Sequence, residues 1–218
     1  SACLVGSEMC IRDRYQVHGH DHKRICFGLD CVDNMTFKSI LDKIQKELVK
    51  RDKVREEIQI DMRKATRLSK QAILFTHQNR FDDAKKSLEE AHDLLNKFKK
   101  ISRKHPDLAY TSLVDAAFQE YAEARTLLGL VEKDQFVTPK EIDIPIISYV
   151  LGVADVIGEL RRKALDSLRG GDVGTSEKCL QTMEHIYTEL IAMDDAYILI
   201  PGLRRKCDVA RNLIEMTR

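Results

Sequence analysis

The chain has 218 residues, and its 36 basic and 35 acidic side chains leave a formal net charge of +1. This balance excludes binding of nucleic acid through overall charge, so any such role must come from local basic patches. No apolar run reaches the roughly 18 residues that a membrane span needs, and the first residues lack the apolar core of a signal peptide. We therefore expect a soluble, cytoplasmic protein that does not enter a membrane.

Residues 1–34 differ in composition from the rest of the chain and contain four of its six cysteines. The stretch "HGHDH", 18–22, is followed by Cys26 and Cys31, and histidine and cysteine are the usual zinc ligands. Their spacing fits no closed pattern of four ligands. A zinc site is therefore one of two explanations for this segment.

The other explanation is that this segment is not part of the native fold. The stretch "LVGSEMCIRDR", 4–14, resembles the translation of a sequencing adapter carried into an open reading frame, and Met35 offers a natural start. We expect residues 1–34 to be a non-native or disordered leader, and residues 35–218 to form a single domain.

The first long helix is predicted over about 36–77. No glycine occurs between Gly28 and Gly129, and apolar residues recur at spacings of three and four, which is the period of a buried helix face. The row consists of Phe37, Ile40, Leu41, Ile44, Leu48, Val54, Ile58, Met62, Ala65, Leu68, Ala72 and Ile73.

The remaining chain predicts five further helices. A second follows the break "HQNRFDD" with Ala84, Leu88, Ala91, Leu95 and Phe98 as its buried row. Pro106 ends it and Asp107 is expected to cap the third. The others are expected at about 108–132, 145–169, 174–193 and from Pro201–Gly202 to the C-terminus. The fold class is all-α, an antiparallel bundle of six to seven long helices, with Cys179 and Cys207 as buried free thiols.

Two pairs of acidic residues are notable because each pair shares one helix face. Asp155 and Glu159 lie four residues apart within the apolar run "YVLGVADVIGEL", 149–160, and Glu120 and Glu123 lie three apart in the preceding helix. Carboxylates in apolar surroundings are costly unless a positive charge meets them. These acids therefore require basic partners or a bound cation.

The residues alone do not decide between basic partners and a bound cation. Salt bridges would use Arg125 or the run Arg161–Lys163. Alternatively, four carboxylates from two facing helices with no histidine nearby suit Mg²⁺ or Mn²⁺, and neither helix carries the Glu-x-x-His of di-iron bundles. Gly152 and Gly158 leave space for a neighbouring backbone or a ligand. A divalent ion with open water positions indicates hydrolysis of a phosphodiester or phosphoanhydride.

Three segments resemble a known family. The stretches "FQEYAEA", 118–124, and "YVLGVADVIGELRRKALDSLRGGD", 149–172, resemble signature segments of translin-associated factor X, and "LSKQAILFTHQ", 68–78, is similar to the end of that family's first long helix. The resemblance extends over roughly 36–218. It implies an all-helical fold that assembles into a closed, RNA-enclosing homo-oligomer, an octamer or hexamer.

The resemblance is closest to the catalytic branch, whose members are Mg²⁺-dependent endoribonucleases that cut single-stranded RNA or passenger strands. Their acidic motifs are matched here by Glu120, Glu123, Asp155 and Glu159, which we expect to be both catalytic and metal-binding. The chain lacks the long insertion and basic tail of the animal catalytic subunit. An archaeal version that assembles with itself is expected.

The RNA is expected on the first helix, where Lys64, Arg67 and Lys70 lie off the apolar row. Such residues are otherwise a solvated helix face, but Lys70 falls within the matched segment 68–78. Single-stranded DNA is an alternative ligand.

Two competing functions remain. The first is a translin-like shell that binds RNA or single-stranded DNA without cleavage, with its acids held in salt bridges. The second is an all-α nucleoside triphosphate pyrophosphohydrolase. That class carries Glu-x-x-Glu followed by Glu-x-x-Asp, whereas Asp155 and Glu159 here have an Asp-x-x-x-Glu spacing.

Overall fold

The computed structural model describes residues 36–108 and 111–218. The chain divides into two compact units, Ser1–Ile44 and Gln45–Arg218, and the packing given below is that of the second unit. The leader and the zinc ligands that the sequence suggests within residues 1–34 lie outside the described residues.

The described residues form α-helices joined by loops and two short 3₁₀ turns, Pro106–Leu108 and Asp194–Ala196, and contain no β-strand. The helices are α1 (Phe37–His77), α2 (Phe81–Lys104), α3 (Ser112–Lys133), α4 (Ile146–Arg169), α5 (Val173–Ile191) and α6 (Leu203–Glu215). The all-α prediction is confirmed. No helix in the described part of the chain is long and apolar enough to cross a membrane.

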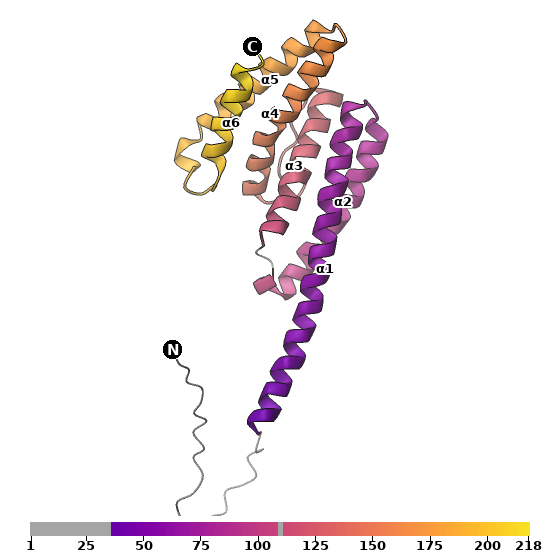
Figure 1. The fold of residues 1–218 in the computed structure, drawn as a ribbon, viewed down its shortest axis with the longest axis vertical. Coiled ribbons are helices and arrows are strands. Elements are labelled where there is room, and N and C mark those ends of the chain that lie inside the picture. The colour runs from indigo at the N-terminus through magenta and orange to yellow at the C-terminus, as the bar shows by residue number, and fades with distance from the viewer. Residues whose placement is uncertain (1–35, 109–110) are drawn as a thin grey trace, which may run out of the picture. The chain divides into compact units, whose positions relative to one another are not determined.

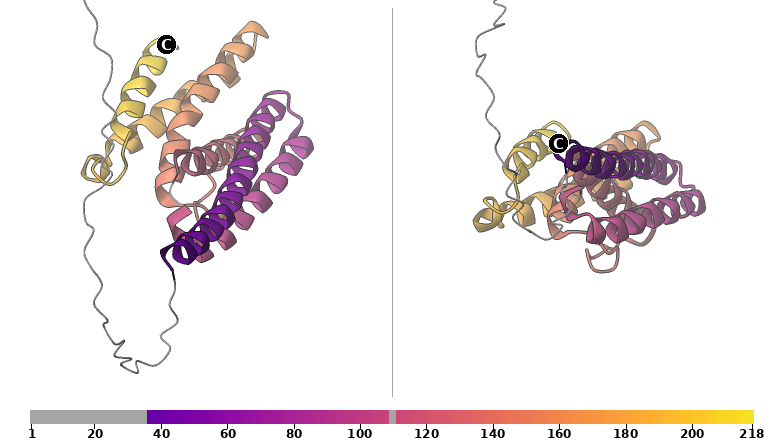
Figure 2. Two further views of the ribbon diagram at one scale, coloured as in Figure 1. Left: turned by 60° about the horizontal axis from the view of Figure 1, so that its bottom comes forward. Right: turned by 90° about the horizontal axis from the view of Figure 1, so that it is seen from below.

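Helix α4 is central to the second unit, because it packs against α3, α5 and α6. Helices α1 and α2 run side by side in opposite directions in both sets of views (Figures 1 and 2), and Lys97 on α2 reaches Glu57 Oε1 at 2.6 Å and Asp61 Oδ2 at 2.8 Å on α1. The loop between α3 and α4 is fastened to α4 by Tyr149, whose hydroxyl donates to the Val137 carbonyl at 2.7 Å.

The core follows the apolar rows that the sequence predicts for α2 and for the second half of α1. Ala84, Leu88, Ala91, Leu95 and Phe98 of α2 are all buried. The row on α1 differs along its length, since it is exposed from Phe37 to Leu48 and fully buried only from Ile58 onward. Cys179 and Cys207 are buried free thiols, as expected.

The start of α3 differs from the prediction. Pro106 does end α2, but Asp107 lies in a 3₁₀ turn and its Oδ2 accepts from Arg51 Nη1 at 2.8 Å instead of capping α3. Thr111 is the cap, because its hydroxyl accepts from the Val114 N–H at 3.4 Å. The helix therefore begins at Ser112, four residues later than predicted.

Candidate functional site

Helices α3 and α4 approach each other closely where both carry acids. A Cβ built on Gly152 would lie 2.6 Å from the Ala122 Cβ and 2.6 Å from the Gln119 carbonyl oxygen, so only glycine permits this approach. The acids flank the contact, with Glu120 and Glu123 on α3 and Asp155 and Glu159 on α4.

All four acids belong to one cluster, called the acid cluster below. Its centre is Glu123, whose pKa is raised to about 8, first by burial and then by the charges of Asp155, Glu120 and Glu159. Two cavities adjoin it. One is lined by Glu120, Glu123 and Asp155, and the other by Glu120, Glu123 and Glu159. The structure therefore brings together the four acids that the sequence selects.

Asp155 is held through both carboxylate oxygens. Its Oδ1 forms an ion pair with the ammonium of Lys206 on α6, and its Oδ2 accepts a hydrogen bond from Gln119 Nε2 at 2.5 Å. Lys206 comes from the far end of the chain and reaches Asp155 because α6 packs on α4.

Glu159 is held by the last residue of α1. His77 Nε2 lies 2.6 Å from Glu159 Oε2, and Arg162 Nη1 lies 3.7 Å from the same oxygen. The hydrogen bond from His77 and the charges of His77 and Arg162 lower the pKa of Glu159, although burial alone would raise it. Glu120 also has a partner on α1, since its Oε1 lies 3.1 Å from Lys70 Nζ.

The sequence prediction that no histidine lies near the acids is wrong, because His77 contacts Glu159 directly. The signal was present in the matched segment 68–78, which ends on His77 and Gln78. No local pattern indicated Lys206, which lies 51 residues beyond Asp155.

Of the basic partners named from the sequence, only Arg162 contacts an acid of the cluster. Arg161 Nε instead donates to Thr217 Oγ1 at 3.2 Å. Arg125 Nε is buried without a hydrogen-bond partner among the described residues. No group of three or more His, Cys, Asp or Glu side chains in the described part of the chain lies close enough to hold a metal ion.

The three basic residues predicted to bind RNA are exposed on one face of α1, at a spacing of three. Lys70 is the member that reaches the acid cluster, through its contact with Glu120, and it lines one of the two cavities. Arg67 lies about one turn before it and Lys64 about two turns before it on the same face. The row therefore leads along α1 to the cluster.

The model of the Translin family matches residues 53–216. An uncharacterized protein of Methanocaldococcus jannaschii, MJ0175, is 32% identical over 171 residues, which cover 78% of this chain and 76% of that protein.

The fold is similar to solved structures. The crystal structure of AfC3PO has a TM-score of 0.73 and 32% identity, covering 82% of this chain and 93% of that one. The structure of AfC3PO in complex with duplex RNA has a TM-score of 0.72 at the same identity, covering 82% and 92%. The crystal structure of apo-NeC3PO has a TM-score of 0.74 and 26% identity, covering 81% and 92%.

The matched family region, 53–216, includes all four acids, the basic row and Lys206. The resemblance in segments 68–78, 118–124 and 149–172 is thus confirmed over most of the chain. This protein is a member of the translin family.

Proposed function

We propose that this protein is a Mg²⁺-dependent endoribonuclease. The observation that carries the proposal is the position of Glu123, half-buried among three other carboxylates, which together with burial raise its pKa to about 8. Like charges gathered in one place repel one another, and a divalent cation relieves that repulsion. The helices hold the acids together in spite of this cost.

The donor set suits Mg²⁺, with Mn²⁺ as an alternative. Glu120, Glu123, Asp155 and Glu159 offer carboxylate oxygens, the ligands that both ions prefer. To hold the ion, Asp155 and Glu120 would give up their contacts with Lys206 and Lys70. When bound, such an ion supplies Lewis-acid activation of water and of the phosphate group.

The surrounding residues orient the acids and leave access to them. His77 positions Glu159, and Gln119 donates to Asp155. A Cβ placed on Gly158 would meet no atom within 4 Å, so the cavity that Gly158 lines together with Asp155 is open at this position. A phosphodiester can approach the acids from this side.

RNA is the expected ligand. The row of Lys64, Arg67 and Lys70 supports binding to the phosphate backbone, and AfC3PO, whose fold is similar, has been solved in complex with duplex RNA. We propose single-stranded RNA or passenger strands as substrate and single-stranded DNA as a further ligand, bound inside a homo-oligomeric shell, an octamer or hexamer.

Exposed apolar side chains on α1 support self-association, since Leu48 is 59% exposed and Val49 is 51% exposed. Light scattering measures the mass of the assembly and so tests for an octamer or hexamer.

A second candidate is binding of nucleic acid without cleavage. It is favoured by the cationic partners of three of the acids, since Lys206, His77 and Lys70 stabilise Asp155, Glu159 and Glu120 without any metal. The same test measures hydrolysis of a nucleoside triphosphate, the activity of the all-α pyrophosphohydrolases.

The test is incubation of the full chain with Mg²⁺ and labelled single-stranded RNA, an RNA duplex or a nucleoside triphosphate. Internal cleavage of RNA is expected. In Asp155→Asn it should fall at least about 100-fold, because losing a charged ligand removes several kcal/mol of transition-state stabilisation. RNA binding should persist. The control is Asp166→Asn on the same helix, where the exposed carboxylate pairs with Arg169 at 3.2 Å.

Three results would contradict the proposal. Cleavage at the normal rate by Asp155→Asn would remove this residue from the reaction. Binding of RNA without cleavage by the unaltered protein would favour the shell. Hydrolysis of the triphosphate with intact RNA would favour the pyrophosphohydrolase.

A further inference from the structure

Lys206 occupies an unusual position for a lysine. Its side chain is 21% exposed, and its ammonium pairs with Asp155 Oδ1 while Gln119 takes the other oxygen of that carboxylate. A cation that bound Asp155 would therefore compete with this ammonium for the same oxygen. At that distance the ammonium and a divalent ion would repel each other, so the presence of one weakens binding of the other.

We infer that Lys206 is a displaceable counter-ion: its ammonium neutralises Asp155 until a divalent cation takes its place, and it then turns into the adjoining cavity to contact a phosphate of the RNA. The inference rests on the proposed function, because it needs the acid cluster to bind a metal ion.

The surroundings allow Lys206 to move. Its flexible stem carries a compact charge, and it lines a cavity of about 530 Å³ together with Asp155 and Gly158. A Cβ on Gly158 would meet nothing within 4 Å, so this wall is open. His77, by contrast, is 7% exposed, and its ring has little room to leave Glu159. Between Lys206 and His77, the partners of the two α4 acids, Lys206 is therefore the one that can be released.

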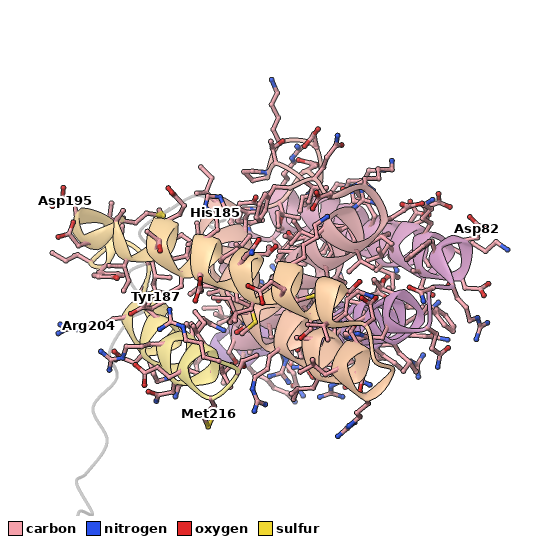
Figure 3. All side chains as sticks on the ribbon, turned by 90° about the horizontal axis from the view of Figure 1, so that it is seen from above. Asp82, His185, Tyr187, Asp195, Arg204 and Met216 are labelled. Atoms are coloured by element: carbon pink, nitrogen blue, oxygen red, sulfur yellow. The ribbon has the colours of Figure 1, made fainter. Side chains whose placement is uncertain are left out.

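The cavity is suited to a phosphate once Lys206 is free. Arg205 also lines it, so two cations would face the cavity while the carboxylates were neutralised by the ion. Lysine and arginine side chains that contact phosphates position a nucleic acid without reading its sequence. Arg204 extends from α6 away from the neighbouring helices (Figure 3), which makes it a suitable control on the same helix.

The experiment compares Lys206→Met with the unaltered full chain after removal of metal. Free Mn²⁺ is measured by electron paramagnetic resonance. RNA binding is measured by filter titration in Mg²⁺ at several salt concentrations. In these titrations the RNA is sub-stoichiometric and the samples are kept on ice. The variant should bind Mn²⁺ at least about tenfold more tightly, since a competing charge is gone. Its RNA affinity should fall, with a salt slope shallower by about 0.7, the value for one phosphate of a single strand.

Three further variants complete the experiment. Lys206→Gln also removes the charge but keeps a donor for Asp155, so it gives the same answer if the methionine variant fails to fold. Lys178→Met breaks an exposed pair with Asp134, at 2.8 Å, and should leave Mn²⁺ affinity unchanged. Arg204→Met should likewise leave Mn²⁺ affinity unchanged.

The outcomes separate the inference from the proposed function. If the unaltered protein binds no Mn²⁺, the metal site itself is wrong and the inference fails with it. If the unaltered protein binds Mn²⁺ but neutral variants of Lys206 bind it equally or more weakly, Lys206 only supports Asp155, and the inference alone is overturned. Tighter Mn²⁺ binding with an unchanged RNA salt slope would overturn the phosphate contact.

Discussion

Glu123 is the acid of the cluster whose protonation links the site to folding stability. Its pKa in the folded protein is about 8, against an ordinary value of 4.5, because burial and three neighbouring carboxylates disfavour its charged form. The folded protein therefore binds a proton at Glu123 over a pH range in which the unfolded chain has lost it.

The sign of the resulting pH dependence follows from this difference. The contribution of Glu123 to stability is fully present below about pH 4.5 and is lost as the pH rises towards 8. In buffer with a chelator, the free energy of unfolding should therefore fall between about pH 5 and 8, as measured by urea denaturation. Glu123→Gln should show a weaker decline over the same range.

Added Mg²⁺ provides the control for this pH dependence. If the cluster binds the ion, Mg²⁺ should restore stability at about pH 8 in the unaltered protein more than in Glu123→Gln, since the charged carboxylate then gains a partner. A free energy of unfolding that stays constant across this pH range in chelator would show that Glu123 is ionised normally.

At the scale of elements, the packing of α3 on α4 decides whether the acids meet. Gly152→Ala should destabilise the fold by about 1–2 kcal/mol, because overpacking a tight helix contact costs about 1–3 kcal/mol and the gain in helix propensity returns only part of it. The added Cβ would lie 2.6 Å from Ala122 and from the Gln119 carbonyl. Chemical denaturation measures the change.

Gly158→Ala is the matched control on the same helix. A Cβ at this position meets nothing within 4 Å, so alanine should stabilise α4 by about 0.5–1 kcal/mol through its better helix propensity. Equal effects of the two substitutions would mean that the close approach at Gly152 does not hold in solution.

The elements themselves are largely predictable from sequence. Periodicity places α1 and α4 within one residue of their observed bounds, because apolar residues recur at the helical period along each of them. The start of α3 is predicted wrongly, since both Asp107 and Thr111 are good caps and only the contact of Asp107 with Arg51 decides between them. Helix propensity alone could not show that α1 exposes its apolar row as far as Leu48.

At the scale of the whole molecule, the basic row on α1 leads to the acid cluster through the contact of Lys70 with Glu120, and we propose that RNA follows this row. Replacing Lys64, Arg67 and Lys70 together by alanine should weaken RNA binding and make its salt slope shallower by about 2, because each neutralised phosphate of a single strand contributes about 0.7. The melting temperature should change little, because exposed charges contribute little to stability. Filter titration and thermal denaturation measure the two effects.

A suitable control for this triple variant replaces Lys46, Lys50 and Lys53, which are also exposed on α1 but lie farther from the acid cluster along the helix. An unchanged salt slope in the first variant would place the RNA elsewhere, and the runs at Lys97–Lys100 or Arg161–Lys163 would be the next to test.

The sequence by itself determined the helical architecture, because periodicity and helix breakers are local properties of the chain. Shared helix faces and apolar surroundings singled out the four acids, and the resemblance of segments 68–78, 118–124 and 149–172 indicated the family. The tertiary structure decided which groups meet those acids. His77, Lys206 and Lys70 come from α1 and α6, and their contacts with α3 and α4 depend on how the helices pack. The pKa of Glu123 depends on the same packing, since burial and neighbouring charge act through space.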